Sequence, residues 1–307
     1  MFHIRLSKCR ACLCVVISLT ASCLITVDAH AQQTGTQRDD LKKLSDDFDD
    51  ASTLKQWSRI FQTEQSNADQ LEQFDIANTK PGWMVMIPYS STWYKDYRGV
   101  LVYKEIRGDF VVTSNIRVAR RNGDGAPRSN YSLAGLMIRT PRNVTPQTWK
   151  PGGENYIFLS LGAANRPGSF QFEVKTTLNS RSTLAVTNAG TPAAMIQIAR
   201  MGNDFILLKK TPDGSWNVHQ RYRRPDMPEQ LQVGLTVYTD YTTASRLKAP
   251  QQNTQVIRNG RPDLVAGFDY VHFQRPAMPA QFQGKSLSSP AEVTDAQLLQ
   301  FLGEHAQ

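Results

Sequence analysis

Short segments in which apolar and polar residues alternate run along most of this 307-residue chain. In "DFVVTSNIRVAR" (109–120), Phe110, Val112, Ile116 and Val118 fall on one face of an extended strand and Asn115 on the other, which is typical of a strand with one buried face. A similar content of β-branched and aromatic residues predicts nine further strands: "RGVLVYKEI", "SLAGLMIRT", "NYIFLSLG", "SFQFEVKTT", "STLAVTN", "AAMIQIAR", "DFILLKK", "WNVHQRY" and "LQVGLTVYTD".

Turn signals separate these strands, among them "NGDG", "NRPG", "RMGND" and "TPDG". The intervals leave no room for crossover helices, so a parallel doubly wound sheet is excluded. The pattern predicts an all-β protein built as two stacked antiparallel sheets or a barrel.

The first 31 residues have a different composition. A basic start, "MFHIRLSK", precedes the apolar run "ACLCVVISLTASCLITV" and a small-x-small site, "AHA", which predicts a signal peptide cleaved after Ala31. We therefore expect an exported protein, periplasmic or extracellular. The apolar run is shorter than the roughly 20 residues of a spanning helix, so no transmembrane segment is expected in the mature chain. A lipoprotein acylated at Cys23 is the alternative.

All four cysteines, Cys9, Cys12, Cys14 and Cys23, lie in this leader, so the mature chain has no thiol for a disulfide or a metal. The formal net charge of the whole chain is +8, and its basic residues are spread out rather than gathered in a stripe with interleaved aromatics. Nucleic-acid binding is therefore not expected.

Several segments are landmarks in a fixed order: "LSDDFDDASTLKQW", "LVYKEIRGDFVV", "AGLMIR", "ENYIFLSLG", "IARMGNDFILLKKTPDGSW", "QVGLTVYTD" and "FDYVHF". Together they resemble the concanavalin A-like lectin/glucanase superfamily, in particular the laminin G-like jelly roll of the enolase-regulation-protein and β-xylosidase C-terminal module type. The resemblance implies a two-sheet antiparallel jelly-roll sandwich over residues 45–274, after a linker at 32–44. It also implies that "FDYVHF" pairs with an early strand after "DDFDD".

Catalytic signals are sparse. The Glu-x-Asp-x-x-Glu strand of the superfamily's glucanases is not present in the sequence. Paired carboxylates from separate strands remain an alternative, with Glu105, Glu154 and Glu173 as candidates, although each is more simply a solvent-facing residue. No cofactor is expected from the motifs.

A structural Ca²⁺ is the one metal that the resemblance implies, where the terminal strands meet. Its candidate ligands are Asp47, Asp49, Asp50 and Asp269. The alternative is that these are charges that protect a strand edge from aggregation.

Two loops rich in aromatic residues have the chemistry of a glycan site, because sugar rings stack on aromatic faces while polar side chains take the hydroxyl groups. The candidate ligand-binding residues are Trp93, Tyr94, Asp96, Tyr97 and Arg98 in one loop, and Trp149 and Tyr156 in the other. The alternative for Trp93 is packing in the core.

The last residues, 275–307, begin as a linker rich in Pro, Gln and Ser and then predict a short helix at 294–303, with Thr294 and Gln297 at capping-box spacing. A helix of this length is marginal alone, so it must dock on its own sandwich or on a protein partner.

The sequence therefore predicts an exported, non-catalytic module that binds a glycan or associates with a surface. A polysaccharide hydrolase or lyase of the same fold is the second hypothesis. A protein-interaction module that uses the C-terminal helix is the third.

Overall fold

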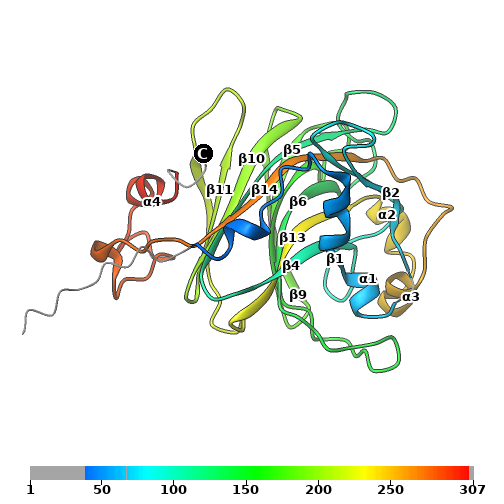
Figure 1. Cartoon of the computed structure of the whole chain (residues 1–307). Coiled ribbons are helices and arrows are strands. Elements are labelled where there is room, and N and C mark those ends of the chain that lie inside the picture. The colour runs from blue at the N-terminus through cyan, green and yellow to red at the C-terminus, as the bar shows by residue number, and fades with distance from the viewer. Residues whose placement is uncertain (1–38, 67, 304–307) are drawn as a thin grey trace, which may run out of the picture. The chain divides into compact units, whose positions relative to one another are not determined.

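The computed structural model describes residues 39–66 and 68–303, which form two antiparallel seven-stranded sheets packed face to face (Figure 1). The front sheet has, in spatial order, β1 (Ser58–Arg59), β4 (Val100–Arg107), β13 (Gln230–Tyr238), β6 (Ser132–Arg139), β7 (Tyr156–Ala163), β8 (Gln171–Leu178) and β9 (Arg181–Asn188). The back sheet has β12 (Asn217–Arg223), β11 (Asp204–Lys210), β10 (Ala193–Met201), β5 (Phe110–Ala119), β14 (Val265–Gln274), β3 (Met84–Pro88) and β2 (Leu71–Ile76).

The predicted two-sheet antiparallel sandwich is confirmed. Three strands were not predicted: the two-residue β1, β2 ("LEQFDI") and β3 ("MVMIP"). β2 lies at the edge of the back sheet and pairs only with β3, so polar residues such as Glu72 are tolerated on it and hide the alternation.

The alternation predicted in β5 places its apolar face between the sheets. Phe110, Val112, Ile116 and Val118 belong to the main core and are at most 1% exposed. The intervening Val111 points to the other side of the back sheet and is nevertheless fully buried. Another part of the chain must therefore cover that outer face.

The C-terminal segment provides this cover. It contains η3 (Ala280–Phe282) and α4 (Asp295–Leu302), and Leu298 and Phe301 of α4 pack in one cluster with Val111 and with Ile206 of β11. α4 lies beside the back sheet, away from the other helices (Figure 1). Its predicted capping box is formed by Thr294 and Gln297.

The remaining short helices are η1 (Lys42–Leu44), η2 (Ala51–Gln56), α1 (Ile60–Thr63), α2 (Tyr241–Ala244) and α3 (Ala249–Thr254). The two ends of the sandwich meet through one bridge, in which Asp46 N donates to Val271 O at 2.9 Å. "FDYVHF" lies in β14, which pairs with β3, an early strand that follows "DDFDD", and also with β5, which was not predicted. The "DDFDD" segment itself forms no strand with β14 and contacts it through the Asp46 bridge and side-chain contacts such as Asp47 with His272.

The predicted leader at 1–31, its cleavage after Ala31 and the Cys23 alternative lie outside the described residues, as does the first part of the 32–44 linker. Within the part of the chain that the structure describes, no helix has both the length and the apolar character needed to span a bilayer.

Candidate ligand site on the front sheet

The outer face of the front sheet is covered by the loop at residues 89–99. Buried side chains of α3 fix this loop: Gln252 accepts from Thr92 N at 3.1 Å and donates to Arg98 O at 2.8 Å. Asn253 accepts from Arg98 N at 2.8 Å and donates to Asp96 O at 2.9 Å. The loop is therefore a rigid cover, which fixes the side chains that it carries.

Trp93 is the core anchor of this cover. Its side chain is 0% exposed, its Nε1 donates to Val100 O at 3.0 Å, and its ring meets the Tyr156 ring edge-on at 5.3 Å. Gly99 permits this packing, because a Cβ at residue 99 would lie 2.8 Å from Trp93 Cδ1. Trp93 therefore takes the packing alternative, and the candidate binding role of Tyr156 is corrected, because that side chain is also 0% exposed.

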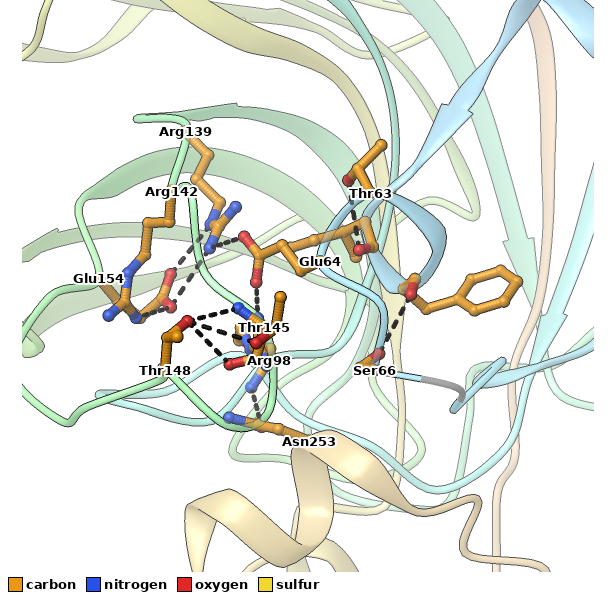
Figure 2. A network of polar contacts seen from close by, with 12 residues as sticks. Thr63, Glu64, Ser66, Arg98, Arg139, Arg142, Thr145, Thr148, Glu154 and Asn253 are labelled. Carbon is orange, nitrogen blue, oxygen red and sulfur yellow. Dashed lines mark hydrogen bonds and ion pairs between the residues drawn. The ribbon is translucent and has the colours of Figure 1, made fainter.

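Five buried or half-buried charges form a chain of ion pairs (Figure 2). One of them, the Arg139 guanidinium, lies 5.9 Å from the centroid of the Trp93 ring. Arg98 pairs with Glu64, Glu64 with Arg139 at 2.8 Å, Arg139 with Glu154 at 2.9 Å, and Glu154 with Arg142 at 2.6 Å. Arg98 is 6% exposed, so its candidate contact with a ligand is also corrected: its partner is a buried carboxylate.

This network keeps Glu154 ionised. Burial would raise the pKa of its carboxyl group, but attraction and a hydrogen bond from Arg139, followed by attraction from Arg142 and Arg98, outweigh burial and lower the pKa. A general acid for glycoside cleavage needs a raised pKa instead. The paired charges of this network therefore stabilise the loops that carry them, and Glu154 does not have the raised pKa of a general acid.

A second buried ion pair, between Glu173 and Lys175 of β8, lies on the same outer face of the front sheet. Lys175 Nζ is 2.9 Å from Glu173 Oε1 and donates to Trp93 O at 2.6 Å. Burial lowers the pKa of the Lys175 ammonium, although the attraction of Glu173 acts in the opposite direction. The ammonium also lies 4.8 Å from the ring centroid of Phe158, a distance at which a cation is attracted to the face of an aromatic ring.

A small cavity opens directly above Lys175. Its volume is about 150 Å³, and it is lined by Thr92, Tyr94, Tyr131, Lys175, Leu184 and Tyr241, which we call the tyrosine pocket. The Tyr241 ring meets the Tyr131 ring at 5.5 Å and the Tyr94 ring at 6.2 Å, both edge to face. All three tyrosines are half-buried, so their rings are packed against one another and still reachable from solvent.

Unusual backbone conformations support this arrangement. Tyr131 has φ +49° and Asp240, next to Tyr241, has φ +61°. The left-handed region is uncommon for a bulky aromatic residue and stores strain, which tends to persist where the surrounding structure holds a functional group in place. Tyr241 N donates to Asn130 O at 3.2 Å, so the two strained segments are tied together.

The other predicted loop residues do not line the pocket. Asp96 Oδ1 accepts from Gly152 N at 2.8 Å and from Ser180 Oγ, so it joins the two predicted loops. Tyr97 donates to Leu247 O at 2.7 Å. Trp149 is half-buried in the second loop. Of the seven candidate ligand-binding residues, only Tyr94 lines the tyrosine pocket.

The candidate calcium ligands do not converge. Asp47 pairs with His272 at 2.6 Å, Asp50 caps η2 at Ser52 N, and Asp269 accepts from Asn115 at 3.1 Å. Asp49 Oδ1 lies toward the backbone of Gly82. Among residues 39–66 and 68–303, no three His, Cys, Asp or Glu side chains are grouped to hold a metal ion, so these four aspartates do not form the implied site.

The three candidate catalytic carboxylates have different environments. Glu105 is exposed, as predicted, and accepts from Gln230 Nε2 at 2.7 Å. The prediction that Glu154 and Glu173 face solvent was wrong: both are 0% exposed, because arginine and lysine side chains from neighbouring positions pair with them.

Sequence reasoning missed Tyr131, Tyr241 and Lys175. Each lies far from the 89–99 loop in the chain, and none belongs to a local motif. The positions of Lys175 and Leu184 follow only from the register of β8 with β9, in which these two residues are partners.

Comparison with known proteins defines the class of fold. No protein-family model matches the chain, and no curated protein matches it. The GH43 protein BlXynB from Bacillus licheniformis superposes with a TM-score of 0.50 and 12% identity, over 76% of this chain and 39% of that one. A functionally unknown protein from Saccharomyces cerevisiae superposes with a TM-score of 0.49 and 13% identity, over 73% of this chain and 99% of that one. A β-glucanase from B. licheniformis superposes with a TM-score of 0.44 and 11% identity, over 75% of this chain and 97% of that one.

The chain therefore has the concanavalin A-like lectin/glucanase fold, and the resemblance stated from the sequence is confirmed at the level of the fold. It spans about two fifths of the GH43 protein. A shared fold does not fix function, so function has to be argued from the site.

Proposed function

We propose that this protein is a non-catalytic carbohydrate-binding module and that a sugar ring occupies the tyrosine pocket. The observation that carries this proposal is the convergence of Tyr94, Tyr131 and Tyr241 from three separate segments around one cavity. At about 150 Å³ the cavity is smaller than the roughly 300–1,000 Å³ of sites for drug-sized ligands, so it suits a single ring. Aromatic faces bind the apolar side of such a ring, and the tyrosine hydroxyls offer hydrogen bonds.

The carboxylates of the same face support binding rather than hydrolysis. Glu64, Glu154 and Glu173 are each at most 2% exposed and each is paired with an arginine or a lysine. Retaining and inverting glycosidases need two carboxyl groups that reach one glycosidic bond, one of them protonated. The arrangement here offers no such pair to the tyrosine pocket.

We also propose that the protein is exported, on the strength of the leader predicted at residues 1–31. Export to the periplasm or the extracellular space would place the tyrosine pocket where polysaccharides are accessible.

Affinity electrophoresis in gels that contain soluble neutral or acidic polysaccharides tests the binding proposal. Tyr94→Ala and Tyr241→Ala should each weaken retention about two- to tenfold, because an aromatic contact contributes roughly 0.5–1.5 kcal/mol beyond its buried area. Tyr270→Ala is the matched control, a half-buried tyrosine on the back sheet, stacked on His272 at 4.2 Å. Unchanged retention in both pocket variants, or no retention of the wild-type protein by any polymer, would contradict the proposal.

A further inference from the structure

A wide groove lies beside the tyrosine pocket. Its volume is about 820 Å³, and its walls come from the segment around residue 129, from α2 and its flanks, and from residues 255–261. Three arginines line it, Arg128, Arg246 and Arg261, and all three are exposed. We call this cavity the arginine groove.

The charges of these arginines are not neutralised within the described chain. Arg128, Arg246 and Arg261 form no ion pair with the carboxylates of residues 39–66 and 68–303. Other arginines of the same residues do pair with carboxylates: Arg59, Arg98, Arg107, Arg121, Arg139, Arg142, Arg221, Arg223, Arg224 and Arg275. Unpaired guanidinium groups around one concavity attract anions.

One carboxylate lines the arginine groove, and it is already engaged. Asp240 is 4% exposed and accepts from Ser90 Oγ at 2.7 Å, from Arg261 N at 2.6 Å and from Thr243 N at 3.2 Å. It therefore fixes the groove wall through backbone and hydroxyl groups and leaves the three guanidinium groups available. Asp263 acts similarly just behind the wall, where it accepts from Arg128 N at 2.6 Å.

The arginine groove and the tyrosine pocket share their walls. Asn130 lines the groove and Tyr131 lines the pocket, and the same holds for the neighbours Thr242 and Tyr241. Asn130 Oδ1 accepts from Thr242 N at 3.2 Å and so locks the two segments together. A chain molecule with one ring in the pocket would therefore extend its next groups along the arginines.

We propose that the site takes an acidic polysaccharide, whose carboxylate or sulfate groups bind Arg128, Arg246 and Arg261 while one of its rings lies in the tyrosine pocket. This inference rests on the carbohydrate-binding function proposed above. The planar guanidinium group binds carboxylate and sulfate through paired, charge-assisted hydrogen bonds. A nucleic acid is also anionic, but three arginines beside one ring-sized pocket fall short of the basic stripe that tracks a run of phosphates.

The test compares retention by three polymers: polygalacturonate, the same polymer after chemical reduction of its carboxyl groups, and a sulfated galactan. Wild-type protein should bind at least one anionic polymer about tenfold more tightly than the reduced polymer, because hydrogen bonds to charged groups are stronger. Comparison of polygalacturonate with the sulfated galactan shows whether the arginines bind carboxylate or sulfate groups. Added salt should weaken this preference, since the arginines are exposed.

Substitutions in the arginine groove test whether its arginines cause the preference for an anionic polymer. Arg128→Gln combined with Arg261→Gln should remove the preference for the anionic polymer and leave the weaker retention by the reduced polymer unchanged. Arg181→Gln is the matched control, an exposed arginine of β9 that does not line the arginine groove. Tyr94→Ala should weaken retention by all polymers.

The outcomes separate the two proposals. Equal, Tyr94-dependent retention by the acidic and the reduced polymer would overturn the acidic-ligand inference and support the carbohydrate-binding function. Failure to bind any polymer would overturn both. Arginine-dependent binding of single-stranded DNA that does not change in Tyr94→Ala would assign the arginine groove to another class of ligand.

Discussion

Trp93 and Tyr94 are adjacent in the chain but have different environments, so the same substitution should affect different properties. Trp93 is 0% exposed, and replacing a buried Trp with Ala typically costs about 3–5 kcal/mol. Tyr94 is half-buried at the pocket, so Tyr94→Ala should cost only about 1 kcal/mol. Urea denaturation of both variants measures this difference. A Trp93→Ala protein as stable as wild type would contradict the core role of Trp93.

Glu154 offers a second test at the same scale. Glu154→Gln leaves Arg139 and Arg142 without their shared charge partner in a buried place, which should lower the free energy of unfolding by about 3–5 kcal/mol. Glu229→Gln is the control, because Glu229 and Arg107 form an exposed pair at 2.7 Å, and such pairs contribute roughly 0–1 kcal/mol. Equal losses in the two variants, again measured by urea denaturation, would mean that the network does not anchor the loops.

At the scale of elements, α4 packs on the outer face of the back sheet and stabilises the sandwich. Leu298 is 0% exposed in the cluster that α4 forms with β5, β10 and β11, so Leu298→Ala should cost about 2–5 kcal/mol. The control is Leu178→Ala, since Leu178 at the end of β8 is 44% exposed. The main unfolding transition, followed by fluorescence, should shift in the first variant. If α4 folded apart from the sandwich, that transition would stay in place.

The elements also show how far the sequence predicts this structure. Alternation revealed β5, whereas the content of β-branched and aromatic residues revealed central strands such as β6 and β7, which are buried on both faces. Alternation did not reveal β2, whose residues on an edge are constrained by only one neighbouring strand. For the site, the local aromatic cluster predicted Tyr94, but Tyr131 and Tyr241 reach it only through the register of distant strands and their connecting loops.

Whether an aromatic or charged residue is buried was the quantity that the sequence could not provide. Trp93 and Tyr94 look equivalent in the sequence, and Glu154 resembles any polar residue of a loop that follows Pro and Gly. Their burial follows from partners on other elements, such as Arg139 on β6 and Gln252 on α3. Long-range pairing therefore decides which candidates meet a ligand and which hold the fold.

For the molecule as a whole, stability should depend on pH through His219, which lies on β12 against the Phe172 ring of the opposite sheet. Burial, followed by repulsion from Lys209, lowers the pKa of His219 from 6.5 to about 4. The unfolded chain therefore takes up this proton more readily, and the free energy of unfolding should fall as the pH decreases from about 6.5 toward 4. Urea titrations across this range should show a flatter dependence in His219→Gln, whose side chain does not titrate. If the free energy of unfolding changed with pH equally in wild type and variant, His219 would not be a source of the pH dependence.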